Sequence, residues 1–281
     1  MSSYSTIETQ TLSADNGVDY AYRCVGSGPN ALPMVLLQHF RGNLDHWDPA
    51  LIDALAQGRR VITFDNTGVA ATSGRTPNTI AAMARDAIEF IDALGLDRID
   101  LLGFSIGSFV AQEIALYRPD LVDRIVLASA APRGAAGIHG WRRDVIAGVG
   151  GREPSPEGYL HAFFPATPEG LEAGQALLGR IYGERTQGRD EPTGWQTRQA
   201  QYDAVTEWGI PNHAMLERLQ GITQPVFVAN GDGDPMIPAR YSYLLAGLLP
   251  NAQIKIYPDA AHGFLFQHHK EFAADVDTFL S

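Results

Sequence analysis

The sequence predicts an α/β fold built on a mostly parallel sheet of about eight strands, with helices on both faces. Three observations lead to this prediction. Short apolar runs alternate along the chain with segments of helical periodicity. The runs are continuously apolar, as expected of strands that are buried on both faces. The chain of 281 residues is 45% hydrophobic and only 19% charged, so it can bury a large core.

Composition and charge exclude several classes of protein. The formal net charge of −11 opposes binding to nucleic acid or to anionic membrane surfaces, because phosphate contacts need clustered Lys and Arg. Cys24 is the only cysteine, so neither an internal disulfide nor a cysteine-based metal cluster can form. The polar start Met1–Gln10 lacks a signal-peptide pattern, and no segment has the length of a membrane span. We expect a cytoplasmic protein; its oligomeric state stays open, with a homodimer among the options.

The first part of the chain predicts a hairpin and then a strand–helix–strand unit. Thr6–Leu12 and Val18–Val25 alternate polar with apolar residues around a turn at Asp15–Gly17, which predicts an antiparallel hairpin at a sheet edge. The next elements expected are a buried strand, a helix and a second buried strand, at Met34–Gln38, about Pro49–Gln57 and Val61–Phe64.

The middle of the chain continues the alternation. Apolar residues recur at three- and four-residue intervals from Ile80 to Leu94, with Asn78 or Thr79 as the N-cap and Gly95 just past the end. A strand, a helix that ends before Pro119, and a further strand follow at Ile99–Leu102, about Ser105–Tyr117 and Arg124–Ala128.

The strand–helix alternation stops after residue 133 and resumes at residue 222. The intervening residues show only helical patterns with Gly- and Pro-rich breaks, at Trp141–Val149, Leu171–Tyr182 and Trp195–Trp208. We therefore predict a core domain of residues 1–133 and 222–281, with a helical cap inserted at 134–221. The core should end with a strand, a helix, a strand and a helix, at Pro225–Asn230, Pro238–Leu249, Gln253–Tyr257 and Gln267–Leu280.

One predicted strand runs directly into a serine flanked by glycines. Gly103-Phe104-Ser105-Ile106-Gly107 has the G-x-S-x-G spacing of a nucleophile elbow, in which a strand reverses sharply into a helix. The glycines let the neighbouring backbones approach closely. Such a turn exposes the Ser105 hydroxyl above the sheet and directs the Ile106 N–H at a developing oxyanion. Ser105 is therefore the predicted nucleophile.

A serine hydroxyl needs a base, and the base needs a partner that fixes its tautomer. Reactive groups lie at the carboxyl ends of parallel strands, so the candidates are residues that directly follow late strands. Asp232 and Asp234 follow the strand at 225–230, and His262 follows the strand at 253–257. The resulting order of serine, acid and histidine is the order expected of this elbow.

With these motifs the chain resembles α/β-hydrolase-fold proteins that use a serine nucleophile, over nearly its whole length outside the insertion. The acid of that family usually lies in a G-x-x-D-x-x-x-P pattern, matched here by Gly231, Asp234 and Pro238, which favours Asp234 over Asp232. The family histidine is similar in context to His262 in Asp259-Ala260-Ala261-His262-Gly263-Phe264. The resemblance implies a triad of Ser105, His262 and Asp234 that needs no cofactor and no metal.

Two stretches depart from the family pattern. Family members commonly carry His-Gly after the first buried strand, whereas this chain reads Gln38-His39-Phe40-Arg41-Gly42. A backbone N–H does not depend on its side chain, so Phe40 is still expected to donate to the oxyanion with Ile106, provided its dihedrals suit a non-glycine residue. In the second stretch, Asp65–Ser73, Ala70 replaces the second glycine of the D-x-x-G-x-G-x-S turn, and we expect a structural role.

The leading hypothesis is an esterase or lactonase that acts on a small to medium, partly apolar molecule through an acyl-enzyme. A serine at the elbow disfavours dehalogenase and epoxide hydrolase chemistry, for which relatives use a carboxylate. A cofactor-free perhydrolase or haloperoxidase, a C–C bond hydrolase and a ligand-binding regulator with little turnover stay open. His39 is expected to be structural. The insertion's own core is expected to contain most of its aromatic residues, Trp141, Trp195 and Trp208 among them.

Overall fold

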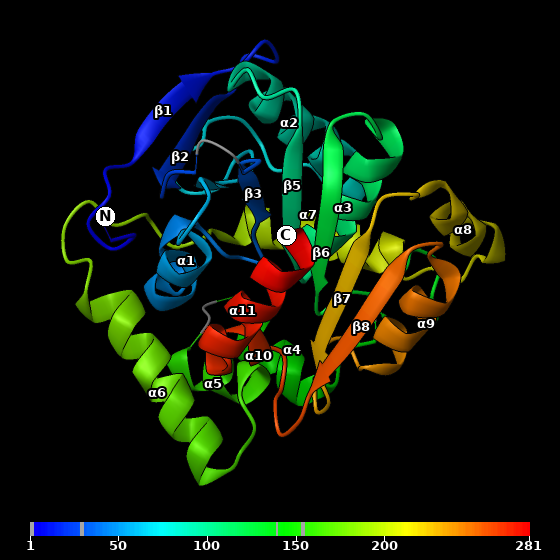
Figure 1. Cartoon of the computed structure of the whole chain (residues 1–281). Helices are drawn as coiled ribbons and strands as arrows, with labels where there is room; N and C mark the ends of the chain where they lie inside the picture. Colours follow the sequence, from blue (N-terminus) through cyan, green and yellow to red (C-terminus); the bar gives the residue numbers. More distant parts are fainter. Residues whose placement is uncertain (1–2, 29–30, 139, 153–154) are drawn as a thin grey trace.

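The computed structural model describes residues 3–28, 31–138, 140–152 and 155–281, so the first two residues of the polar start of the chain lie outside it. Eight strands form one sheet in the order β1-β2-β4-β3-β5-β6-β7-β8. β1 (Gln10–Ser13) and β2 (Asp19–Val25) make an antiparallel edge hairpin, and β2 is also antiparallel to β4 (Val61–Phe64). All other neighbouring strands are parallel, which confirms the predicted fold class (Figure 1).

The hairpin's first strand begins four residues later than predicted. Polar–apolar alternation suggested a start at Thr6, but the chain before Gln10 folds back on the core instead. Tyr4 is buried, and its hydroxyl donates a hydrogen bond to Leu44 O at 2.8 Å. The tertiary contact of Tyr4 therefore takes this segment away from the edge of the sheet.

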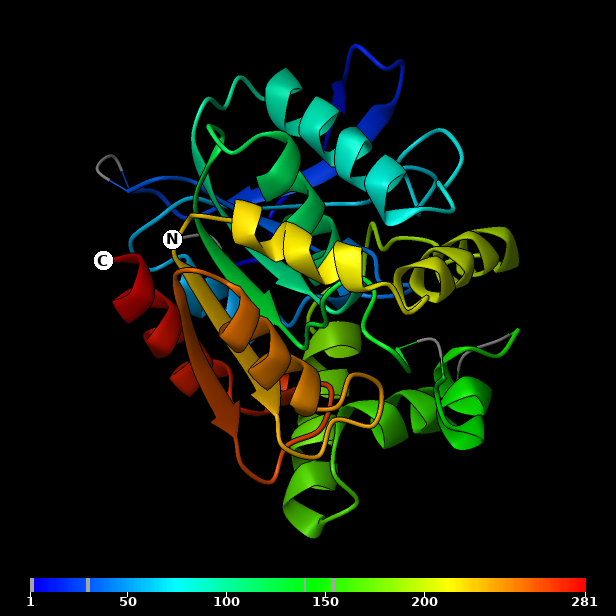
Figure 2. The same ribbon diagram turned by 90° about the vertical axis from the view of Figure 1, so that its right-hand side faces the viewer.

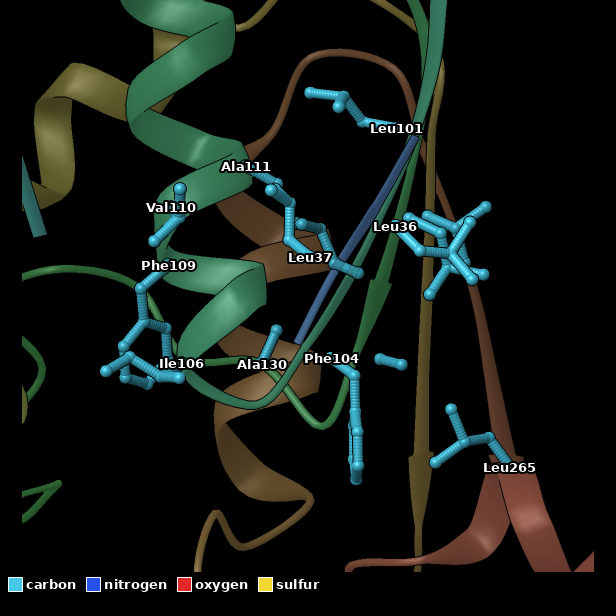
Figure 3. Packing of buried hydrophobic residues seen from close by; sticks show 14 of the residues in the cluster. Leu36, Leu37, Leu101, Phe104, Ile106, Phe109, Val110, Ala111, Ala130 and Leu265 are labelled. Carbon is cyan, nitrogen blue, oxygen red and sulfur yellow. The ribbon is translucent and has the colours of Figure 1, made fainter. Parts of the chain in front are cut away.

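The central strands explain the continuous apolar runs. In β3 (Met34–Leu37) and β5 (Ile99–Phe104) every side chain is buried. Figure 3 shows Leu36 and Leu37 on opposite sides of the sheet, with Leu37 lying beside α3 (Ile106–Tyr117). In the register of β3 and β5, Leu37 lies opposite Gly103, so the segments that follow the two strands emerge side by side.

Helices cover both faces of the sheet (Figure 2). Residues 80–93 form a helix as predicted, and the structure selects Thr79 as its cap because the Thr79 side chain accepts a hydrogen bond from Ala82 N. The helix predicted from about Gln267 to Leu280 corresponds to the helix His269–Leu280, and a short helix at Phe264–Gln267 precedes it. One face carries α1 (Pro49–Leu55) and α11 (His269–Leu280), and the other carries α2 (Ile80–Ala93), α3 and α9 (Arg240–Leu248). The remaining core elements are β6 (Val122–Ala128), β7 (Val226–Gly231), β8 (Ala252–Tyr257), α10 (Phe264–Gln267) and the short turn η1 (Leu44–His46), and a second short turn, η2 (Arg218–Gly221), precedes β7.

The segment between β6 and β7 is helical in its described residues. Three of its helices match predicted patterns: α4 (Arg143–Val149), α6 (Pro168–Gly183) and α7 (Trp195–Trp208). α5 (Pro156–Phe163) and α8 (His213–Glu217) were not predicted. The arrowheads of β7 and β8 point towards α4, α5 and α6, so these helices cover the carboxyl ends of the strands (Figure 1). The exact limits of a cap at 134–221 stay a prediction.

The tryptophans of this segment correct one expectation in part: Trp141 packs against Tyr202 of the same segment, with ring centroids 5.8 Å apart, but the tryptophans also contact the rest of the molecule or solvent. Trp208 stacks on Phe109 of α3 with ring centroids 5.1 Å apart, and Trp141 packs edge-on against Phe40 at 5.4 Å. Trp195 is 43% exposed. The apolar faces of the helical segment are therefore used to dock it on the rest of the molecule. No described helix is long and apolar enough to cross a membrane.

Candidate active site

Ser105 lies at the sharp turn between β5 and α3. Its backbone has φ 57° and ψ −121°, a conformation that L-residues rarely adopt and that is strained unless its surroundings hold it. Ser105 N donates to Ala128 O at 3.0 Å, and Ser105 O accepts from Ser108 N at 2.8 Å and from Ser108 Oγ at 2.5 Å. These bonds to β6 and to the first turn of α3 keep the serine at the turn.

Steric limits explain why two positions of the pentapeptide, 103 and 107, are glycine. A Cβ on Gly107 would lie 2.1 Å from Leu37 O, and a Cβ on Gly103 would lie 2.4 Å from Gly107 O. Both obstacles are backbone atoms that no change of rotamer can move. The close approach of α3 to β3 and β5 therefore requires glycine at both positions, as the sequence pattern predicted.

The structure brings the three predicted triad residues into one hydrogen-bonded line. His262 Nε2 lies 3.0 Å from Ser105 Oγ, and His262 Nδ1 lies 2.8 Å from Asp234 Oδ2. The other Asp234 oxygen accepts from Met236 N at 2.8 Å and Ile237 N at 2.9 Å. All three side chains are buried. Since a carboxylate can only accept, Nδ1 carries the proton and Nε2 is free to accept from the serine hydroxyl.

Asp232 takes a different position. It is exposed, and its Oδ1 accepts a hydrogen bond from Ala260 N at 3.2 Å, in the loop that leads to His262. Of the two candidate acids, Asp234 is therefore the one that contacts the histidine. Asp232 lies at the entry to the histidine loop, whereas the hydrogen bond with the imidazole of His262 is made by Asp234.

Aromatic rings enclose the imidazole of His262. The ring of Phe104, from β5, has its centroid 5.1 Å away, and the ring of Phe163, from α5, lies edge-on at 5.2 Å. Gly263 N also donates to Phe163 O at 2.8 Å, which ties the histidine loop to α5. Phe163 belongs to α5, a helix that the sequence patterns do not predict.

Two backbone N–H groups near Ser105 are available for an oxyanion. Within the described part of the chain, neither Phe40 N nor Ile106 N donates a hydrogen bond to the protein. Phe40 is not among the residues with positive φ, so its backbone conformation suits a non-glycine residue. His39 O accepts from Gly42 N at 3.0 Å, which closes the loop that presents the Phe40 N–H.

His39 has the surroundings of a structural histidine. Its Nδ1 lies 2.9 Å from Phe40 O, and because a carbonyl only accepts, Nδ1 carries a proton there. Burial lowers the pKa of His39 to about 3, so the ring is neutral at physiological pH. Its Nε2 atom is buried without a hydrogen-bond partner.

The loop after β4 also has a structural arrangement. Asp65 Oδ1 accepts from Leu44 N at 2.8 Å, and Thr72 Oγ1 donates to Asp65 O at 2.9 Å. Ala70, which replaces a glycine of the family pattern, keeps a left-handed φ of 46°. These hydrogen bonds therefore tie the end of β4 to η1 and to the turn that follows β4.

A cavity of about 410 Å³ opens on Ser105 and His262. Its lining contains both apolar side chains and charged or polar ones. Burial raises the pKa of Asp190, one of the charged residues of the lining, to about 6. Among the described residues, no three His, Cys, Asp or Glu side chains gather as a metal site. The apolar side chains of the lining include Phe40, Val149, Phe163 and Met236, and the polar ones include His39, Arg41, Asn43, His46, Arg189, Asp190 and Thr193.

Comparisons with known proteins agree on the fold. Residues 33–269 match the family model described as alpha/beta hydrolase fold. A solved structure of an alpha/beta hydrolase fold protein from Chitinophaga pinensis is 39% identical, with a TM-score of 0.92, and covers 100% of this chain and 99% of its own.

Two further relatives carry functional names. "Putative carbamate hydrolase RutD" of Caulobacter sp. (strain K31) is 30% identical, over 94% of this chain and 97% of its own length. The enol-lactonase from Burkholderia xenovorans LB400 is 21% identical with a TM-score of 0.76, covering 96% of this chain and 99% of its own, a likeness of fold alone.

Proposed function

The chain belongs to the alpha/beta hydrolase fold family, and from that premise we propose that it is a serine hydrolase that cleaves carboxylic esters or lactones through an acyl-enzyme. The observation that carries the proposal is the line of hydrogen bonds from Ser105 Oγ through His262 to Asp234, at 3.0 and 2.8 Å. This line opens on a cavity of about 410 Å³, which suits a small to medium substrate.

In the proposed reaction His262 acts as the general base. Its Nε2 takes the proton of the Ser105 hydroxyl as the oxygen attacks the substrate carbonyl, and Asp234 stabilises the imidazolium that forms. His262 then gives this proton to the leaving alcohol, and the acyl group stays on Ser105. A water molecule, deprotonated by His262 in turn, attacks the acyl carbon. The bond from this carbon to Ser105 Oγ then breaks, His262 returns the proton to Ser105 Oγ, and the acid is released.

The negative charge of the tetrahedral intermediate develops on the former carbonyl oxygen. The free N–H groups of Phe40 and Ile106 are the donors that we assign to this oxygen. The donors are fixed before the substrate arrives, so little reorganisation is needed when the charge appears. The roles of both residues rest on their position and on the absence of other partners in the described chain.

The mixed lining of the cavity favours a substrate that has both an apolar part and a polar part. Phe40, Phe163 and Met236 supply the apolar part of the lining, and Arg189 and Asp190 belong to its polar part. A carbamate is a second candidate, because the name of the Caulobacter relative refers to carbamates and that relative is similar over nearly its full length. The same attack on a carbonyl carbon would open either kind of substrate.

The test combines covalent labelling with a substrate panel. A fluorophosphonate should add one adduct to the intact protein and none to Ser105→Ala. Ser242→Ala is a matched control, because Ser242 is also a buried serine and its hydroxyl has no hydrogen-bond partner. Ser242→Ala should be labelled like the wild type. Labelling of Ser105→Ala at the wild-type rate would remove Ser105 from the mechanism.

Hydrolysis is then measured on esters, lactones and carbamates that vary separately in the acyl part and the leaving group. Turnover of esters or lactones that Ser105→Ala lacks is the expected result. Turnover confined to carbamates would select the second candidate, and labelling without any turnover would favour a binding protein that keeps the fold.

A further inference from the structure

Arg41 directly follows Phe40 and connects the oxyanion loop to the segment between β6 and β7. Its φ of 62° lies in the left-handed region, which is unfavourable for a residue with a Cβ. Its guanidinium donates to Gly151 O at 2.6 Å and to Thr193 O at 3.1 Å. Thr193 Oγ1 in turn donates to Arg41 O at 2.7 Å. Contacts from outside the core therefore hold Arg41 in its strained conformation.

The most informative of these contacts is made by the Arg41 backbone. Arg41 N donates to Gln201 Oε1, in α7, at 2.7 Å. On the other side of the same peptide, Phe40 O lies 2.9 Å from His39 Nδ1. Since a peptide unit is planar, these two bonds fix the orientation of the Phe40–Arg41 peptide. One of them comes from the core and the other from α7.

The orientation of this peptide bears on the preceding one, which carries the Phe40 N–H. The two peptides share the Phe40 Cα, so a rotation of the second changes the φ and ψ angles that direct the first. Gln201 is 1% exposed, so loss of its side chain would leave the Arg41 N–H buried without a partner. The loop would then have to rearrange to satisfy this group.

We propose that Gln201 is a positioning residue that orients the Phe40 N–H for the oxyanion, so that the reactive site is complete only while α7 is docked. The proposal rests on the proposed function for the role of Phe40. Gln201 lies 160 positions from Arg41 in the chain, and the contact through which it would act is its hydrogen bond from the Arg41 N–H. Docking of the helical segment would thereby control catalysis as well as access to the cavity.

Thr197 offers a matched control on the same helix. It lies one turn before Gln201, and its Oγ1 also bonds the core, donating to Gly68 O at 2.9 Å and accepting from Thr76 Oγ1 at 3.0 Å. Thr197 does not line the cavity of Ser105. Thr197→Val therefore removes docking bonds of α7 without touching the oxyanion loop.

The first experiment compares steady-state hydrolysis of one ester by Gln201→Leu, Gln201→Glu and Thr197→Val. Gln201→Leu should lower kcat by about 10- to 100-fold with little change in KM, because an oxyanion donor acts mainly on the transition state. Gln201→Glu keeps an acceptor for Arg41 N and should stay within about fivefold of the wild type. Thr197→Val should keep the wild-type kcat. Equal losses in Thr197→Val and Gln201→Leu, or a rise in KM alone, would overturn the proposal.

A second measurement does not depend on turnover. Hydrogen exchange followed by mass spectrometry should be faster in the peptide covering residues 39–43 of Gln201→Leu and unchanged there in Thr197→Val. Unchanged exchange in Gln201→Leu would show that Gln201 does not hold this loop. If the wild type takes no fluorophosphonate label, the proposed function fails, and the exchange result still decides whether Gln201 orders the loop.

Discussion

The substitution Gly107→Ala tests the geometry of the elbow most directly. The added Cβ would lie 2.1 Å from Leu37 O and 2.5 Å from Leu37 C. These distances are more than about 1 Å short of ordinary contact, so α3 and β3 must move apart. Because Leu37 contributes backbone atoms of a central strand, no side chain can give way, and we expect a loss of about 3 kcal/mol in the free energy of unfolding.

Urea denaturation followed by circular dichroism measures this loss. Gly179→Ala is the control, since Gly179 lies inside the helix α6 and a Cβ there meets nothing within 4 Å. It should stabilise the protein by about 0.5–1 kcal/mol, because alanine restricts the unfolded chain and favours helix. A Gly107→Ala protein that unfolds at the wild-type urea concentration would refute the reasoning. Such a result would mean that α3 can shift at no cost.

Three further predictions concern the acids and the oxyanion loop. In the folded protein the pKa of Asp190 is about 6, against an ordinary value of 3.8, so the folded state binds this proton more tightly than the unfolded state does. The free energy of unfolding should therefore fall as the pH rises from about 4 to 6. Asp190→Asn should flatten that part of the urea-midpoint profile. Asp234→Asn should lower kcat by about 10⁴-fold and Asp232→Asn by far less; the opposite ranking would identify the wrong acid. The melting temperature of Arg41→Gly should be higher than that of Arg41→Ala, since only glycine adopts φ 62° freely. Equal melting temperatures would show that the φ of this residue does not limit stability.

The sheet, and the hydrogen-bonded line of Ser105, His262 and Asp234, could be predicted because each part has a signal in a short stretch of sequence. A strand with two buried faces shows a continuous apolar run, and Leu36 and Leu37 lie on opposite faces as that pattern requires. The glycines beside Ser105 reflect steric limits within a few residues of the turn. Asp234 and His262 follow from the rule that reactive groups lie at the carboxyl ends of parallel strands.

The helical segment could be predicted only in part, because its local signals are weak. α5 has eight residues, with proline at its start and Gly158 within it, and its pattern is too short to stand out. Phe163 contacts the ring of His262, and the pattern of apolar residues in the sequence gives no sign of such a long-range contact. The same holds for Trp208, which stacks on Phe109 of α3.

The two departures from the family's glycine pattern show where residue-by-residue resemblance stops being informative. Ala70 keeps a left-handed φ of 46°, so the chain retains the glycine-like conformation without the glycine. Phe40 does not, and the left-handed residue of its loop is the next one, Arg41. In the sequence both positions simply lack a glycine of the family pattern. In the structure Ala70 keeps a left-handed conformation, whereas at Phe40 the strained backbone belongs to the next residue, Arg41. In our proposal, the orientation of the Phe40 N–H depends on Gln201, which is distant in sequence and bonds the Arg41 N–H. No local motif encodes this contact.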